Sequence, residues 1–341
     1  MKVVVTGLMG TQADYEPIRE AGHDLIFALP SGPGRGAPLT DAELIEICRD
    51  ADGILSMSLS GEVMASAPNL RAVVASAIGY EKIDVESATN LGILVCNSPT
   101  AENFVSVSES TVLLALALLK RLKRKEARIR NGEWGQVSDR GHLLWKKTVG
   151  LIGLGRTGSG VAQRLAGWDV EVIAYDPYLP EGRARELGVR LVDLDTLLSQ
   201  SDVVSLHVVV TPETRGMIGE AQLRRMKPTA YLINTSRGEA IDEDALTRAI
   251  QEEWIAGAAL DTFDTEPLAL DSSLRDLDPE RVLLTPHNVA HTMASLHANR
   301  ALAIQSLLTV LKGEVPSTVV NPAAVDSWKT RFAAAHSPSG E

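Results

Sequence analysis

The segment TVGLIGLGRTGSGVAQRLAGWDVEVIAYD, residues 148–176, constrains the fold of this chain most strongly. Gly153, Gly155 and Gly158 follow an apolar run that predicts a strand and open a stretch that predicts a helix, with the spacing GxGxxG. In such a turn the first glycine permits the tight bend, the second lets a pyrophosphate approach the backbone, and the third lets helix and strand pack closely. Asp176 ends the next apolar run, 18 residues beyond Gly158, where it can accept hydrogen bonds from an adenine-ribose diol. The segment therefore predicts a dinucleotide site.

The same segment predicts which coenzyme binds. N–H groups at the start of the helix, among them those of Arg156 and Thr157, would meet the phosphates at the positive end of the helix dipole. A 2′-phosphate would meet the carboxylate of Asp176, so we expect NAD rather than NADP. The alternative interpretation is a tight turn followed by a surface aspartate. Because strand, helix and acid occur together, the dinucleotide site is favoured.

Short apolar runs alternate with helical stretches along the whole chain. One set of strands is predicted at residues 2–6, 53–57, 70–75 and 93–96, with a helix at 41–49. A second set is predicted at 148–153, 170–176, 203–209, 230–235, 256–261 and 282–285. Runs that are continuously apolar are typical of parallel sheets covered on both faces. Strands that alternate with helices predict an α/β fold, and 341 residues suffice for two domains.

Three segments lie outside these two sets of strands. Helical stretches are predicted at 104–130 and 290–311, whereas the residues from Ala323 onward end in AAHSPSGE and are expected to fray. The first stretch ends in KRLKRKEARIR, which could bind a polyanion or could be a solvated helix end whose cations complement the helix dipole. The net charge of −11 favours the solvated helix end.

Composition argues against several classes of function. With 33 basic and 44 acidic side chains, the chain has no electrostatic footprint for nucleic acid or an anionic membrane surface. Its two cysteines, Cys48 and Cys96, form neither a disulfide framework nor a four-thiolate metal site, and we expect no metal. The longest apolar run, residues 112–119, is shorter than the roughly 20 residues that a bilayer requires. The start MKVVVTG lacks signal-peptide anatomy, so we expect a cytoplasmic protein without a membrane partner.

Three further segments carry a family resemblance. They are NTSRGEAIDEDAL at 234–246, GAALDTFDTEPL at 257–268 and TPHNVAHT at 285–292. In this order and spacing, together with the dinucleotide loop, they resemble the D-isomer-specific 2-hydroxyacid dehydrogenase family. The resemblance covers nearly the whole chain, from about Lys2 to Pro322.

The resemblance implies a doubly wound Rossmann coenzyme domain inserted into a smaller flavodoxin-like substrate domain. We therefore expect residues 102–289 to form the NAD-binding domain, residues 1–101 and 290–322 the substrate domain, and residues 323–341 a C-terminal tail. The active site would lie in the cleft between the domains, at the carboxyl ends of strands. The family is usually a homodimer built around the helix and loop after the first hinge, here residues 105–145.

The family's catalytic roles fall on Arg237, Glu266 and His287. An imidazole titrates near neutral pH, so His287 would donate a proton to the keto oxygen and take it back in the reverse reaction. Glu266 would hold the ring and stabilise the imidazolium, and Arg237 would offer a planar fork to the substrate carboxylate and carbonyl. Taken singly, the three could be a surface ion pair, a turn acid before proline and a loop histidine. Their common place just after strands favours the catalytic interpretation.

Other positions carry over with less specific roles. In the family, Thr235 and Ser236 lie where the backbone passes the cofactor, and Asp261 helps to place the nicotinamide carboxamide. Three further histidines are expected to have structural rather than catalytic roles: His207, His291 and His297.

The resemblance also implies a small, unphosphorylated 2-hydroxy or 2-keto acid as substrate. Ala77, Ile78 and Gly79 match the loop whose N–H groups bind the substrate carboxylate. Family members that act on phosphorylated substrates carry arginines in the loop after the second strand of the substrate domain, whereas the loop here, SMSLSGE at 56–62, has none. Glu266 argues against formate oxidation, because the family's formate enzymes have glutamine at this position.

Two alternatives stay open at this point. Some relatives of the family are nucleotide-sensing corepressors that keep the same three residues, so the chain could be an NAD(H)-sensing binding protein without turnover. The second alternative is oxidation of another small anion, such as phosphite, at an arginine–glutamate–histidine site. A panel of 2-keto acids and phosphite, tested with the nicotinamide coenzyme, distinguishes these functions.

Overall fold

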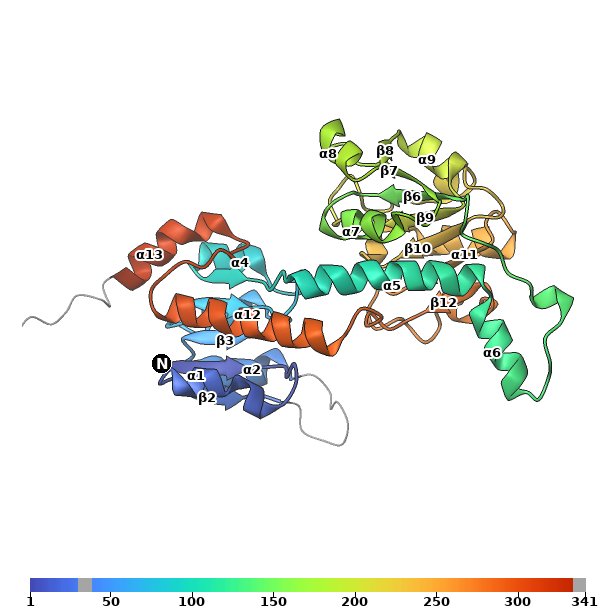
Figure 1. Cartoon of the computed structure of the whole chain (residues 1–341). Coiled ribbons are helices and arrows are strands. Elements are labelled where there is room, and N and C mark those ends of the chain that lie inside the picture. Colours follow the sequence, from blue (N-terminus) through green and yellow to red (C-terminus); the bar gives the residue numbers. More distant parts are fainter. Residues whose placement is uncertain (30–38, 334–341) are drawn as a thin grey trace, which may run out of the picture. The chain divides into compact units, whose positions relative to one another are not determined.

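The computed structural model describes residues 1–29 and 39–333, and the chain divides into two compact units. Unit 1 comprises Met1–Asn103 and Thr292–Glu341, and unit 2 comprises Phe104–His291. Each unit contains one parallel sheet (Figure 1).

Unit 1 is built on a five-stranded parallel sheet of order β2-β1-β3-β4-β5. Its strands are β1 (Lys2–Val5), β2 (Asp24–Phe27), β3 (Gly53–Leu55), β4 (Ala72–Val74) and β5 (Leu94–Cys96). Its helices in the described ranges are η1 (Gln12–Tyr15), α1 (Glu16–Glu20), α2 (Asp41–Cys48), α3 (Gly61–Ala65), α4 (Val85–Asn90), α12 (Met293–Leu311), η5 (Pro322–Ala324) and α13 (Val325–Ala333). This strand order is that of the flavodoxin-like doubly wound fold.

Unit 2 is built on a seven-stranded parallel sheet of order β12-β11-β10-β9-β6-β7-β8. Its strands are β6 (Thr148–Ile152), β7 (Glu171–Tyr175), β8 (Arg190–Leu191), β9 (Val203–Leu206), β10 (Tyr231–Asn234), β11 (Gly257–Leu260) and β12 (Val282–Leu284). Its helices are α5 (Ala101–Leu119, which begins in unit 1), α6 (Leu122–Arg130), η2 (Val137–Asp139), α7 (Arg156–Leu165), α8 (Glu181–Glu186), α9 (Leu194–Gln200), α10 (Glu220–Leu223), η3 (Gly238–Ala240), α11 (Glu243–Gln251) and η4 (Ser273–Asp276). The order reverses between β6 and β9, as in a Rossmann sheet, and ligands bind at such a switch point.

Both sheets are buried on two faces, which explains the continuous apolar runs. In β1, Val4 packs in one core cluster, whereas Val3 and Val5 pack in another. In β6, Leu151 and Ile152 likewise belong to different clusters. Because successive side chains of a strand point to opposite faces, a strand covered twice needs apolar residues at every position. The predicted parallel α/β architecture is confirmed.

Two strands escape the sequence prediction, and both lie at sheet edges. In β2, Asp24 and Ile26 are exposed, so the strand lacks a continuous buried run. The other missed strand, β8, has only two residues. Edge strands are half-solvated and short, which weakens the apolar signal that identifies a strand.

The prediction of one long helix at 104–130 is wrong. α5 ends at Leu119, α6 begins at Leu122, and Arg121 between them has a left-handed backbone with φ of 51°. Among the described residues, α5 is the helix that is long and apolar enough to cross a membrane by length and composition alone. Its Leu114 and Leu118 are buried in a core cluster of unit 2, as in the core helix of a globular domain.

Residues 120–145, which contain α6 and the loop that follows it, form what we call the arm, which extends away from the seven-stranded sheet (Figure 1). Arg124 contacts Asp139 at 2.7 Å and Glu280 at 2.6 Å, and Arg128 contacts Asp139 at 2.7 Å. A backbone hydrogen bond from Gln136 and the two guanidinium groups lower the pKa of Asp139 to about 2. Acidic residues of the same unit therefore form ion pairs with two arginines of the basic run. These ion pairs support the interpretation of the run as a helix end rather than a polyanion site.

The expectation that the chain frays from Ala323 onward is wrong for the part that the structure describes. Val325, Trp328 and Phe332 recur at helical spacing in α13 and pack on the core of unit 1. Trp328 is only 2% exposed. The sequence signal was present, as an apolar stripe at intervals of three and four residues. Residues 334–341 lie outside the described residues.

Candidate active site

The glycine-rich turn between β6 and α7 has the backbone geometry that a dinucleotide requires. Gly153 has φ of +91°, and a Cβ atom on it would lie 2.6 Å from the carbonyl oxygen of His207. A Cβ atom on Gly158 would lie 2.2 Å from the carbonyl oxygen of Gly153, so neither position accepts a side chain. Gly155 has open space around it, with no atom within 4 Å of the Cβ position. A phosphate can therefore approach the backbone at Gly155, in front of the N-terminus of α7.

Asp176 lies immediately after β7 and is tied to this turn. Its Oδ2 accepts a hydrogen bond from the Leu154 N–H at 2.9 Å, and its Oδ1 accepts one from the Tyr178 N–H at 3.1 Å. The carboxylate of Asp176 is thus fixed beside the turn, where an adenine ribose would lie in a Rossmann domain. In the first turn of α7, the guanidinium of Arg156 lies 5.0 Å from the ring centroid of Phe104.

Helix α5 packs closely against the start of α7. The hydroxyl of Ser108 donates to the carbonyl oxygen of Thr157 at 3.0 Å. A Cβ atom on Gly160 would lie 2.4 Å from the Ser108 Oγ. These contacts fix the first turn of the helix whose N–H groups face the glycine-rich loop.

His207 lies just beyond β9, beneath the glycine-rich turn. Burial lowers its pKa to about 4. Neither ring nitrogen has a hydrogen-bond partner among the described residues. His207 is therefore neutral at physiological pH and is no donor of a proton there.

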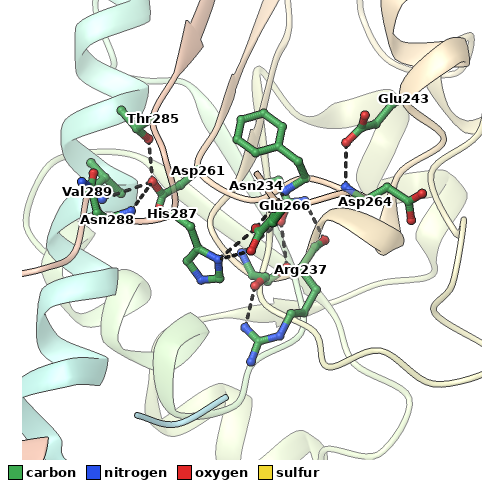
Figure 2. Close-up of polar contacts among 12 residues, drawn as sticks. Asn234, Arg237, Glu243, Asp261, Asp264, Glu266, Thr285, His287, Asn288 and Val289 are labelled. Carbon is green, nitrogen blue, oxygen red and sulfur yellow. Dashed lines mark hydrogen bonds and ion pairs between the residues drawn. The ribbon is translucent and has the colours of Figure 1, made fainter. Parts of the chain in front are cut away.

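Arg237, Glu266 and His287 all follow the carboxyl ends of three neighbouring strands of unit 2, β10, β11 and β12 (Figure 2). The His287 Nδ1 lies 2.9 Å from both Oε1 and Oε2 of Glu266. The imidazole is 46% exposed and the carboxylate 24% exposed. With Nδ1 engaged by the carboxylate, Nε2 is the ring atom that can exchange a proton with a ligand.

Asp261 holds the loop that carries His287. It is 4% exposed, and its Oδ1 accepts hydrogen bonds from the Thr285 hydroxyl at 2.6 Å, the Asn288 N–H at 3.0 Å and the Val289 N–H at 3.1 Å. His287 lies between these partners with a left-handed φ of 50°, which is uncommon outside glycine. Three hydrogen bonds on one buried oxygen explain how the loop maintains this conformation.

Asn234, the last residue of β10, shapes the loop that carries Arg237. Its Oδ1 accepts from the N–H and the hydroxyl of Ser236, at 3.0 and 2.8 Å, and its Nδ2 donates to the Arg237 carbonyl at 2.8 Å. The hydroxyl of Thr235 lies 3.0 Å from that of Thr111. The sequence reading did not single out Asn234, although it opens the motif NTSRG.

Ala77, Ile78 and Gly79 belong to unit 1, where they follow β4. The Ala77 carbonyl accepts from the Ser98 N–H at 2.8 Å, and the Ile78 carbonyl accepts from the Asn97 Nδ2 at 2.8 Å. In the described part of the chain, the N–H groups of residues 77–79 donate to no other group. Two carbonyls of this loop therefore bond to residues 97 and 98 of the same unit, whereas its N–H groups are not used by the hydrogen bonds within the described part of that unit.

Residues 1–29 and 39–333 contain no cluster of side chains that is a candidate metal site. No group of three or more histidine, cysteine, aspartate or glutamate side chains there could hold a metal ion. Burial raises the pKa of Cys48 to about 11 and that of Cys96 to about 12, so both are neutral thiols.

Three comparisons with known proteins show what this chain is similar to. The family model described as D-isomer specific 2-hydroxyacid dehydrogenase, NAD binding domain, matches residues 112–289. A glyoxylate reductase of Korarchaeum cryptofilum is 39% identical over 300 residues, which are 85% of this chain and 88% of that protein. A D-3-phosphoglycerate dehydrogenase of Methanocaldococcus jannaschii is 39% identical over 287 residues, 83% of this chain but 54% of that protein. The solved structure of TT0316 protein from Thermus thermophilus has a TM-score of 0.82 at 30% identity and covers 94% of this chain and 100% of that one.

Proposed function

Because this chain belongs to the D-isomer-specific 2-hydroxyacid dehydrogenase family, we propose that it interconverts a small unphosphorylated 2-keto acid and its 2-hydroxy acid. NAD is the coenzyme of the matching domain family. The observation that carries the proposal is the contact of 2.9 Å between His287 Nδ1 and Glu266, on strand ends that also carry Arg237.

The coenzyme is assigned to unit 2, whose residues fit it. The open backbone at Gly155 and the N–H groups of Arg156 and Thr157 would receive the phosphates, and Asp176 the adenine-ribose hydroxyls. On the nicotinamide side we place Thr235, Ser236 and Asp261, whose Oδ2 takes no part in the three loop contacts. When bound, nicotinamide supplies the hydride in keto-acid reduction and accepts it in the reverse direction.

The side chains of this chain bind the acid and move its proton. Arg237 would bind the substrate carboxylate and the carbonyl oxygen through its planar fork, which stabilises negative charge developing on that oxygen. His287 Nε2 would donate the proton to the oxygen in reduction and remove it from the hydroxyl in oxidation. Glu266 would keep the ring oriented through Nδ1 and balance the charge of the imidazolium.

We assign part of the substrate binding to unit 1, whose Ala77, Ile78 and Gly79 would add backbone N–H donors for the carboxylate. The absence of a phosphate partner supports an unphosphorylated acid. The loop at 56–62 contains no arginine or lysine, and its Ser56 Oγ bonds to the Thr6 hydroxyl at 2.7 Å and the Ser58 carbonyl at 2.6 Å. From the sequence, the strand before this loop was counted as the second of the unit. It is β3, the third strand, since β2 was not predicted. The cytoplasmic location stays a prediction.

A substrate panel tests the proposed function. We expect kcat/KM for NADH oxidation with glyoxylate or another small 2-keto acid to exceed that with 3-phosphohydroxypyruvate by about 10–100-fold. The phosphate would find no cation in the loop at 56–62 and would lack charge-assisted hydrogen bonds worth roughly 1.5–3 kcal/mol. The variant Ser58→Arg, which adds a cation to the loop, should reduce this ratio. A wild-type preference for the phosphorylated acid would contradict the proposal. Turnover of phosphite alone, or tight NADH binding without turnover of any acid, would replace it by the corresponding alternative.

We also propose that the enzyme is a homodimer whose subunits meet through the arm. Large apolar side chains are exposed along it, among them Ile129, Trp134, Val137 and Leu143, and Trp134 is 83% exposed. Soluble proteins rarely leave such a group of apolar side chains in water unless it is a binding surface. The dimer contact that we expect from the family resemblance, residues 105–145, includes the arm.

The oligomeric state tests this assignment. At micromolar concentration, light scattering should give twice the chain mass of 36.6 kDa for the wild type and a lower mass for Trp134→Glu. Leu270→Glu is the matched control, since Leu270 is exposed in the same unit but outside the arm. A wild-type monomer, or equal dissociation of both variants, would rule out the arm as the interface.

A further inference from the structure

The loop that carries Glu266 rests on the segment that carries Arg237. Gly238 follows Arg237, and a Cβ atom built on it would lie 1.9 Å from the carbonyl carbon of Phe263 and 2.3 Å from the nitrogen of Asp264. Only a residue without a side chain allows the two backbones to approach this closely. The backbone next to Arg237 therefore determines the position of the loop that carries Glu266.

Glu243 provides a second contact between the same two segments. It is the first residue of α11, and its Oε1 accepts a hydrogen bond from the Asp264 N–H at 2.8 Å (Figure 2). The helix is capped without it, because the Asp242 side chain accepts from the Ala245 N–H. The carboxylate of Glu243 is thus directed at the loop rather than used as a helix cap.

Three successive hydrogen bonds connect Glu243 to the imidazole. Glu243 holds the N–H of Asp264, the preceding N–H of Phe263 donates to Glu266 Oε1 at 3.2 Å, and Glu266 contacts His287 Nδ1 at 2.9 Å. Because Phe263 and Asp264 are consecutive, a shift of one N–H shifts the other. Displacement of the loop would move the carboxylate that orients the ring.

We propose that Glu243 is a positioning residue of this active site. It fixes the loop of Glu266 against the segment of Arg237, and so sets the geometry of the His287–Glu266 pair relative to the guanidinium. The motif NTSRGEAIDEDAL then has two tasks, since it carries the anion-binding arginine and also supports the acid of another motif. The inference rests on the proposed function, because the geometry matters through proton transfer by His287.

The charge of Glu243 can be separated from its hydrogen bond. Partial burial and the neighbouring Asp264 and Asp244 raise the pKa of Glu243, against the lowering effect of the Asp264 N–H. A raised carboxylate pKa means that the folded state disfavours the ionised form of Glu243. The free energy of unfolding therefore falls as the pH rises from the carboxylate's ordinary pKa through its raised pKa in the folded state. A neutral acceptor of the same length should therefore be tolerated. Besides Glu243 and Asp264, the charged residues labelled around the His287–Glu266 pair in Figure 2 are Arg237 and Asp261.

The kinetic test compares Glu243→Ala with Glu243→Gln. We expect Glu243→Ala to lower kcat for 2-keto acid reduction by about 10–100-fold, the effect of misplacing reacting groups by about an ångström. The alkaline limb of its kcat/KM profile should move to lower pH, because the imidazolium is less well stabilised. Glu243→Gln retains the acceptor and should remain within about threefold of wild type. The KM for NADH should not change in either variant.

Asp244→Ala is the matched control, since Asp244 is an exposed acid in the same helical turn. It should leave kcat and the pH profile unchanged. If Glu243→Ala does not fold, Glu243→Asp replaces it, because a side chain shorter by one methylene does not reach the Asp264 N–H. A folded Glu243→Ala with wild-type kcat and pH profile would overturn the inference.

A second readout needs no turnover. The His287 Nδ1 proton, hydrogen-bonded to a carboxylate, is expected as a low-field NMR resonance that disappears in His287→Asn. It should shift or broaden in Glu243→Ala and persist in Glu243→Gln. If the wild type reduces no acid, the proposed function fails while this resonance still decides the positioning role. An unchanged resonance in Glu243→Ala would refute that role independently.

Discussion

His287→Asn is expected to lower kcat for 2-keto acid reduction by about 10²–10⁴-fold, the usual contribution of a general acid. The proposed acid is Nε2 of a ring whose Nδ1 lies 2.9 Å from both oxygens of Glu266. Asparagine keeps a polar side chain but has no titratable nitrogen. It also tolerates the left-handed φ of 50° at this position better than alanine does. Steady-state kinetics at saturating NADH measure the effect.

The matched control for this variant is His297→Asn. His297 is an exposed histidine of α12 in unit 1, and its replacement should leave kcat unchanged. Binding of NADH, followed by nucleotide fluorescence, should be the same in both variants and the wild type, because neither residue belongs to the glycine-rich turn. A His287→Asn enzyme with wild-type turnover would refute the assignment of the general acid.

Arg237→Lys is expected to lower kcat/KM for the 2-keto acid by about 10²-fold or more, although it preserves the positive charge. A lysine cannot present two parallel N–H groups to the carboxylate and the carbonyl oxygen, and each charge-assisted hydrogen bond is worth roughly 1.5–3 kcal/mol. The loop itself should survive, because Asn234 Nδ2 holds the carbonyl oxygen of residue 237 at 2.8 Å. Initial rates across a range of keto-acid concentrations separate the effects on kcat and KM.

Arg215→Lys, at an exposed position of the same unit, is the control and should behave as wild type. The melting temperature of Arg237→Lys should also stay close to that of wild type. A wild-type KM and kcat in Arg237→Lys would mean that a fork is not needed, and the residue's role in binding the acid would have to be abandoned.

Much of the fold was readable from the sequence because its signals are local. The glycine spacing, the apolar run before Gly153 and the acid at Asp176 lie within one βαβ unit, where turn geometry and strand burial dictate residue types. Arg237 and His287 stand directly after predicted strands, and parallel strands end on a common edge. Element boundaries were less accurate where the pattern is weak, as at the left-handed Arg121 between α5 and α6.

The supporting contacts of the candidate site were not readable in the same way. Gly238 looks like an ordinary loop glycine until the backbone of Phe263 is seen to lie against it. Glu243 looks like a favourable acid in a first helical turn, and its bond to the Asp264 N–H joins positions 21 residues apart. Asp261 likewise shows its three loop contacts only in three dimensions. Such partners have no fixed spacing in sequence, so no periodicity identifies them.

The sequence alone determined the parallel α/β class, the nucleotide-binding turn and the membership that its motifs implied, because burial and backbone geometry restrict residue types position by position. Only the tertiary structure decided that the tail continues as α13 on the core of unit 1, that Nδ1 rather than Nε2 of His287 meets Glu266, and that Asp261 and Glu243 support the loops around it. These features depend on distances between segments remote in the chain, and such distances exist only after the sheets have assembled.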